Sequence, residues 1–191
     1  MSTLPVRLPK RLPFSGMAAP IRPLVQQLQE EAERAGFPKP GEPIRMLEAG
    51  SSGGLLSSLI FETPCGPHVK VADFADVSPE TLEGAVERSS GWACRCHFIN
   101  NTLEHLALRA DYDLILTWGC FSGNGDQERM AQSLTARQKA GGLLLQFHDQ
   151  AEPNLLGFAL HRYSLLATRW YAASGGREPK YASAWGWRGR P

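Results

Sequence analysis

The sequence lacks the features that would assign this protein to a membrane or, by charge alone, to a nucleic acid. No apolar run approaches the roughly 20 residues that a membrane-spanning helix needs, and no signal-peptide core is recognisable. The net charge is only +1, so it provides no overall attraction to nucleic acid or to an anionic lipid surface. We therefore expect a soluble, cytoplasmic protein without a membrane or nucleic-acid partner.

The sequence also lacks a cysteine pattern typical of zinc sites or disulfide scaffolds. Its four cysteines, at positions 65, 94, 96 and 120, form neither a Cys-x-x-Cys pair nor a Cys/His cluster with zinc spacing. Cys94 and Cys96 are two residues apart, as neighbours on one face of a strand are. Reduced thiols and no metal site are the expectation.

Acidic residues are missing from the head of the chain. The first is Glu30, whereas four basic residues precede it, and prolines at 5, 9, 13, 20 and 23 argue against an amphipathic targeting helix. A length of 191 residues suits a single domain. Within it we expect a basic arm and helix over 1–40, a core over 41–150, and a C-terminal helix and short tail over 151–191.

Strand and helix patterns alternate along the chain. Apolar residues at helical spacing predict helices over 20–36, 55–60, 76–89, 126–141 and 154–173, and alternating or unbroken apolar runs predict strands over 44–50, 68–74, 94–100, 112–118 and 143–149. This order predicts an α/β fold that is Rossmann-like and doubly wound, with a mostly parallel sheet and helices on both faces. Only a short segment follows the last predicted helix, so a pair of C-terminal strands after it is expected to be incomplete. The apolar last helix is a candidate oligomer interface.

A glycine-rich turn follows the first predicted strand. Ligands of such sheets bind beyond the carboxyl ends of the strands, so the loops at 48–54, 73–78, 100–102, 117–122 and 148–150 should converge on one crevice. The turn reads Gly50-Ser-Ser-Gly53-Gly54, which fails the G-x-G-x-x-G pattern of dinucleotide sites. A nicotinamide-dependent oxidoreductase is therefore disfavoured.

The turn resembles the glycine motif of class I S-adenosylmethionine-dependent methyltransferases. Glu48, Gly50 and Gly54 match that motif, and Ser52 replaces its middle glycine. The segments "DVSPETLEGA", "FINNTLEHL" and "YDLILTWGC" are similar to those that follow or form the next three strands of the family. The similarity covers about residues 44–149 and implies S-adenosyl-L-methionine as cofactor.

The resemblance implies a set of cofactor contacts. An acidic residue after the second strand would hold the ribose hydroxyls; the candidates are Asp73 and Asp76, and the spacing of Asp76 to the cap residue Ser78 favours Asp76. Asn101 would lie near the adenine and Thr117 near the methyl group. The full set of implied cofactor contacts is Glu48, Gly50, Ser51, Ser52, Gly54, Asp73, Asp76, Asn101 and Thr117.

The same resemblance implies methyl transfer to a small-molecule acceptor. The fourth-strand segment lacks an Asn-Pro-Pro-Tyr type of motif, which leaves a hydroxyl or carboxyl acceptor as the expectation. His148 and Asp149, after the fifth strand, are the candidates for a catalytic base. One alternative is a catalytically degenerate methyltransferase-like subunit that binds or activates a partner. An RNA ribose methyltransferase is disfavoured, because the lysine it requires is replaced by Gln146 or His148.

Overall fold

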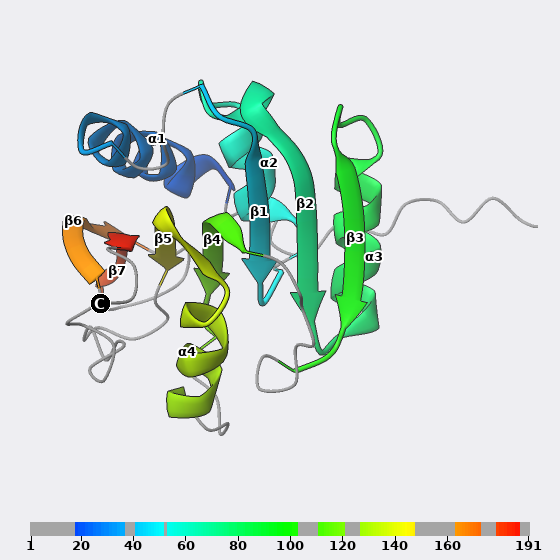
Figure 1. Ribbon diagram of the computed structural model, residues 1–191. Helices are drawn as coiled ribbons and strands as arrows, with labels where there is room; N and C mark the ends of the chain where they lie inside the picture. The colour runs from blue at the N-terminus through cyan, green and yellow to red at the C-terminus, as the bar shows by residue number, and fades with distance from the viewer. Residues whose placement is uncertain are drawn as a thin grey trace, which may run out of the picture.

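All strands that the structure describes belong to one seven-stranded sheet (Figure 1). The structure is a computed structural model that describes residues 18–36, 41–51, 53–102, 111–120, 127–147, 163–172 and 179–187. The strand order is β3-β2-β1-β4-β5-β7-β6. The strands are β1 (Ile44–Ala49), β2 (Val69–Asp76), β3 (Arg95–Asn100), β4 (Tyr112–Trp118), β5 (Gln138–Phe147), β6 (Tyr163–Ala172) and β7 (Pro179–Trp187).

The first five strands are parallel, and β7 runs antiparallel to both β5 and β6. The strand order reverses between β1 and β4, which is the switch point at which ligands of open parallel sheets bind. The predicted Rossmann-like α/β class is therefore confirmed.

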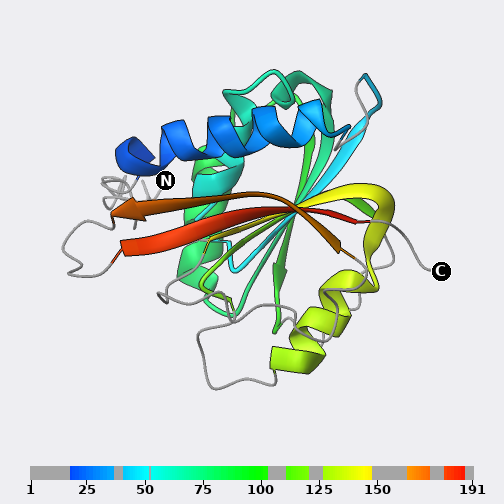
Figure 2. The same ribbon diagram turned by 90° about the vertical axis from the view of Figure 1, so that its left-hand side faces the viewer.

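Helices cover both faces of the sheet (Figure 2). On one face lie α1 (Ala18–Arg34), α2 (Leu55–Phe61) and α3 (Pro79–Ser89), and α4 (Gln127–Thr135) lies on the other; a short 3₁₀ turn, η2 (Gly66–His68), precedes β2. The core between the sheet and the first three helices contains Leu28, Leu59, Phe74, Leu116 and Leu145, all 2% exposed or less. The apolar spacing that predicted a helix near the N-terminus is confirmed by α1.

Two boundaries differ from the expected ones because strand pairing overrides local pattern. β2 continues to Asp76, where it still pairs with Asn100 of β3, whereas the alternation of its sequence ends at residue 74. The predicted helix over 126–141 stops at Thr135. Gln138 already pairs with Tyr112 at the start of β4, and its Nε2 donates to the Tyr112 carbonyl oxygen at 3.3 Å.

The expected C-terminal helix over 154–173 is wrong for residues 163–172, which form β6; residues 151–162 lie outside the described part of the chain. The segment is rich in Tyr, Trp and Thr, residues that favour strands. It pairs with β7 along its length, and β7 pairs with β5. The antiparallel strand pair is therefore present, and the helical interface expected for oligomerisation does not exist over these residues. None of the described helices has the length and hydropathy to cross a lipid bilayer.

Candidate functional site

Hydrogen bonds join the loops at the carboxyl ends of the parallel strands. The Gly50 amide donates to the Ala75 carbonyl oxygen at 2.9 Å, and the Asn101 amide donates to the Asp76 carbonyl oxygen at 3.1 Å. The Gly119 amide donates to the carbonyl oxygen of Phe147 at 3.0 Å. The Cys120 thiol also donates to the Ala49 carbonyl oxygen at 2.7 Å, so the ends of neighbouring strands from β1 to β5 are joined. The loop at 148–150, with His148 and Asp149, lies outside the described residues.

The turn after β1 depends on glycine. Gly50, Gly53 and Gly54 have φ angles of +65°, +69° and +78°. Residues with a Cβ rarely adopt this backbone conformation. A Cβ on Gly50 would overlap the sulfur of Cys120 and lie 3.3 Å from the Trp118 carbonyl oxygen. The end of β4 thus packs directly against the turn. Ser52 lies outside the described residues.

Asp76 is the carboxylate that the structure places beside this turn. Its Oδ2 accepts from the Ser51 amide at 2.8 Å, and its Oδ1 accepts from the Ser78 amide at 2.8 Å. The side chain of Ser78 in turn caps α3 by accepting from the Thr81 amide at 3.2 Å. Because a carboxylate offers about four lone-pair sites, both Asp76 oxygens keep capacity for a ligand.

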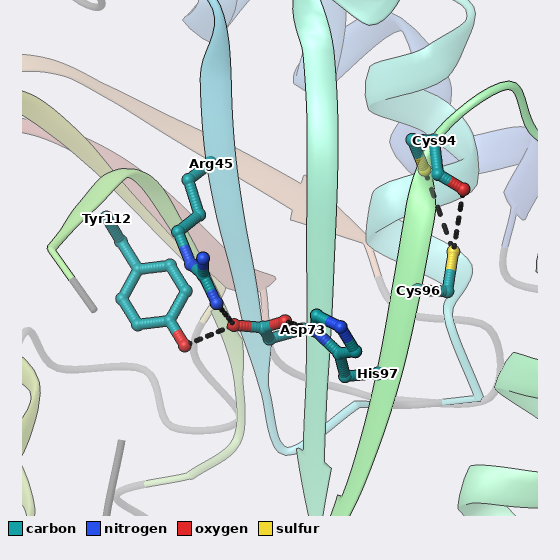
Figure 3. A network of polar contacts seen from close by, with 6 residues as sticks. All are labelled: Arg45, Asp73, Cys94, Cys96, His97 and Tyr112. Carbon is teal, nitrogen blue, oxygen red and sulfur yellow. Dashed lines mark hydrogen bonds and ion pairs between the residues drawn. The ribbon is translucent and has the colours of Figure 1, made fainter. Parts of the chain in front are cut away.

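Asp73 lies three residues earlier in β2 and has a different environment (Figure 3). Its side chain is 1% exposed, and it accepts from Arg45 Nη2 at 2.8 Å and from Tyr112 Oη at 2.5 Å. The Nδ1 of His97 lies 2.6 Å from its Oδ1. The structure does not bring Asp73 to the strand ends with the other candidate residues.

The ordinary pKa values of two partners shift within this cluster. Burial and then the hydrogen bond to Asp73 raise the pKa of Tyr112. Burial alone would lower the pKa of Arg45, but the hydrogen bond and charge of Asp73 raise it above its ordinary value. In both partners the contributions of Asp73 favour the protonated form.

Glu48 points under α2 and is fully buried. Its Oε2 accepts from the Ser57 amide at 2.8 Å and from the Ser57 hydroxyl. The N-cap of α2 is Gly54, which has no side chain to serve this purpose, so Glu48 supplies the acceptor and the negative charge that a helix N-terminus favours. A second anion at this end of α2 would face a carboxylate.

Arg88 of α3 makes a hydrogen bond to the glycine turn. Its Nη1 donates to the Gly53 carbonyl oxygen. Burial lowers the pKa of Arg88, and the nearby Glu48 and Glu87 act in the opposite direction. The sequence analysis did not identify Arg88, because its contact with Gly53 does not follow from spacing along the chain.

Asn101 and Thr117 differ in their exposure to solvent. Asn101 is exposed and its Oδ1 accepts from the Thr102 amide at 2.8 Å. Thr117 is fully buried in β4, paired with the last residue of β1, Ala49. Within the described part of the chain, three buried side-chain oxygens at this edge of the sheet have no hydrogen-bond partner: Ser51 Oγ, Thr117 Oγ1 and Gln146 Oε1.

Cys96 lies in β3 and Cys94 just before its first residue, away from this edge (Figure 3). Their sulfurs are 3.6 Å apart. Burial and the Cys96 thiol raise the pKa of Cys94 to about 12. Among the residues that the structure describes, no three His, Cys, Asp or Glu side chains are grouped as metal ligands.

No protein-family model matches the sequence, and no curated protein is similar to it in sequence. Solved structures are similar in fold. The N-methyltransferase NodS from Bradyrhizobium japonicum WM9, in complex with S-adenosyl-L-homocysteine, has a TM-score of 0.69 and 14% identity, covering 88% of this chain and 87% of NodS. Magnesium protoporphyrin IX methyltransferase (ChlM) from Synechocystis PCC 6803 with bound SAM has a TM-score of 0.64 and 11% sequence identity. The match covers 94% of this chain and 85% of ChlM.

A third similar structure is the precorrin-6y C5,15-methyltransferase from Geobacter metallireducens GS-15, with a TM-score of 0.62 and 13% sequence identity. The match covers 95% of this chain and 92% of that protein. The chain has the class I methyltransferase fold. In this methyltransferase fold the described candidates Glu48, Gly50, Ser51, Gly54, Asp76, Asn101 and Thr117 all lie at or next to the carboxyl ends of β1 to β4.

Proposed function

We propose that this protein is an S-adenosylmethionine-dependent methyltransferase that acts on a small-molecule acceptor. The observation that carries the proposal is the 2.8 Å hydrogen bond from the Ser51 amide to Asp76. It fixes an ionisable carboxylate at the end of β2 against the glycine turn at the end of β1. That arrangement provides acceptors for two adjacent hydroxyls beside a backbone surface that a ligand can approach closely.

The residues present fit the cofactor. The remaining lone pairs of Asp76 would hold the ribose hydroxyls, and the unpartnered Ser51 Oγ adds a polar group within the turn. Glu48 places a negative charge at the start of α2, where a dinucleotide would place its pyrophosphate. A cationic sulfonium cofactor suits that charge better than an anionic one. The cofactors bound to NodS and ChlM support the same choice.

When bound, S-adenosylmethionine supplies a methyl group activated by its positive sulfur. The chain's own contribution is then to position the acceptor and to exclude water. Thr117 is proposed to lie near the methyl group, and Asn101 near the adenine. His148 or Asp149 is proposed to take the proton that a hydroxyl acceptor loses. The proposed setting is the cytoplasm, where the four cysteines would stay reduced.

The proposal is tested by calorimetric titration with S-adenosylhomocysteine. The wild-type protein is expected to bind, and Asp76→Ala to bind at least about tenfold more weakly, because hydrogen bonds to a charged acceptor contribute about 1.5–3 kcal/mol each. Ser78→Ala is the matched control. It removes the α3 cap beside Asp76 but leaves the carboxylate, so its affinity should stay within about twofold of wild type.

Absence of binding at millimolar S-adenosylhomocysteine would overturn the proposal. The remaining candidate would then be a degenerate methyltransferase-like subunit that acts through a partner. If Asp73→Ala weakened binding more than Asp76→Ala does in the folded proteins, the ribose assignment to Asp76 would be wrong.

A further inference from the structure

Two polar side chains lie next to each other inside the sheet, at the penultimate positions of β4 and β5. Thr117 and Gln146 are register partners and are 0% and 1% exposed. Ala49 pairs with Thr117 on the other side, and Ala75 pairs with Ala49. Register partners on neighbouring strands present their side chains on the same face. Ala75, Ala49, Thr117 and Gln146 therefore form a row of side chains across four strands, with two alanines at one end and the two polar residues at the other.

Neither polar side chain has its hydrogen-bonding capacity met. Thr117 Oγ1 and Gln146 Oε1 are both buried and both without a partner in the described chain. Leaving such a group unpaired costs about 1–3 kcal/mol, and native proteins leave few of them. The pair lies one residue from the loops that form the candidate site. A bound group that forms hydrogen bonds with Thr117 and Gln146 would explain why two unpaired polar side chains are buried next to the candidate site.

The chemistry of the pair restricts that group. A glutamine carbonyl oxygen only accepts hydrogen bonds, so the group must donate one, whereas the threonine hydroxyl can donate or accept. The row from Ala75 to Gln146 contains no charged side chain. A carboxylate has no hydrogen to donate to Gln146 Oε1, so its contact with the pair would leave two buried acceptors facing each other, which is costly. A neutral hydroxyl satisfies both requirements.

We infer that Thr117 and Gln146 bind and orient the methyl acceptor, and that they select a neutral hydroxyl over a carboxylate. This inference rests on the proposed methyltransferase function. In the reaction the bond from sulfur to the methyl carbon breaks and a bond from the hydroxyl oxygen to that carbon forms. The single proton of the hydroxyl is donated to Gln146 in the bound acceptor and passes to the proposed base, His148 or Asp149, as the methyl group is transferred. Gln146 accepts a hydrogen bond from the acceptor and takes no proton, so it acts as a positioning residue.

The test uses phenol and benzoate as probes, because they share a ring and differ in carrying a neutral O–H or an anion. Binding to the protein saturated with S-adenosylhomocysteine is followed by saturation-transfer NMR. Wild type should bind phenol in preference to benzoate. Gln146→Met, which keeps the side-chain length, should bind phenol at least about tenfold more weakly, and Thr117→Val should weaken phenol binding in the same direction.

Two further measurements separate the possible failures. Calorimetry with S-adenosylhomocysteine reports the proposed function, and its affinity for Gln146→Met should stay within about twofold of wild type. The melting temperature of ligand-free Gln146→Met should rise by about 2–4 °C, because the substitution removes an unpaired buried carbonyl. A fall would show that Gln146 has a structural partner and would overturn the inference. Equal or preferred binding of benzoate, unchanged phenol binding in Gln146→Met, or no binding of either probe would also overturn it.

Discussion

Replacing Asp73 by alanine is expected to destabilise the fold without affecting the cofactor site. The carboxylate is buried and has three partners: Arg45, Tyr112 and His97. The side chains of Arg45 and His97 are 35% and 45% exposed, so after the substitution both can turn to water, and each lost pair costs at most about 1 kcal/mol. Tyr112 is fully buried, and its unpaired hydroxyl costs about 1–3 kcal/mol.

Together these contributions predict a loss of about 3 kcal/mol in the free energy of unfolding. Urea unfolding followed by tryptophan fluorescence measures it. The exposed Asp111→Ala is the matched control and should change stability by less than about 0.5 kcal/mol. Adding Tyr112→Phe to Asp73→Ala should recover part of the loss, because it removes the unpaired hydroxyl. A loss below about 1 kcal/mol would refute this reasoning.

Two further predictions concern the glycine turn and a buried thiol. Gly50→Ala should lower the free energy of unfolding by about 2–3 kcal/mol, from the cost of a positive φ and the overlap with Cys120; adding Cys120→Ala should restore part of it, and a neutral Gly50→Ala would contradict the packing described. Burial raises the pKa of Cys65 to about 11. With the other three cysteines changed to serine, alkylation at pH 8 should be roughly a hundredfold slower in the native protein than in urea, and should accelerate as pH rises toward 11. The folded state keeps the Cys65 proton longer than the unfolded chain does, so this thiol's contribution to stability is complete below about pH 8.5 and is lost as pH rises through 11. Fast native alkylation at pH 8 would contradict that burial.

Local patterns in the sequence determined the order of the described α-helices and strands from α1 to β5 and the class of the fold. Apolar spacing placed α1, and Ser78 with Pro79 placed the start of α3, because caps and amphipathic faces are encoded within a few residues. The glycines at 50, 53 and 54 predicted a special turn, since only glycine adopts its φ angles readily. Each of these properties depends on neighbours in the chain.

Only the tertiary structure shows that Asp76 lies beside the glycine turn and that Asp73 does not. The alternation of β2 ends near Asp73, but pairing with β3 extends the strand to Asp76 and leaves Asp73 enclosed by residues 28, 39 and 24 positions away. The same non-local pairing made Gln138 part of β5 and residues 163–172 part of β6. Glu48 was expected near the ligand, and its hydrogen bonds to Ser57 show that it caps α2. The sequence determined which loops lie at the carboxyl ends of the strands. Their partners were decided by strand register and burial, because both depend on segments that are distant in the chain.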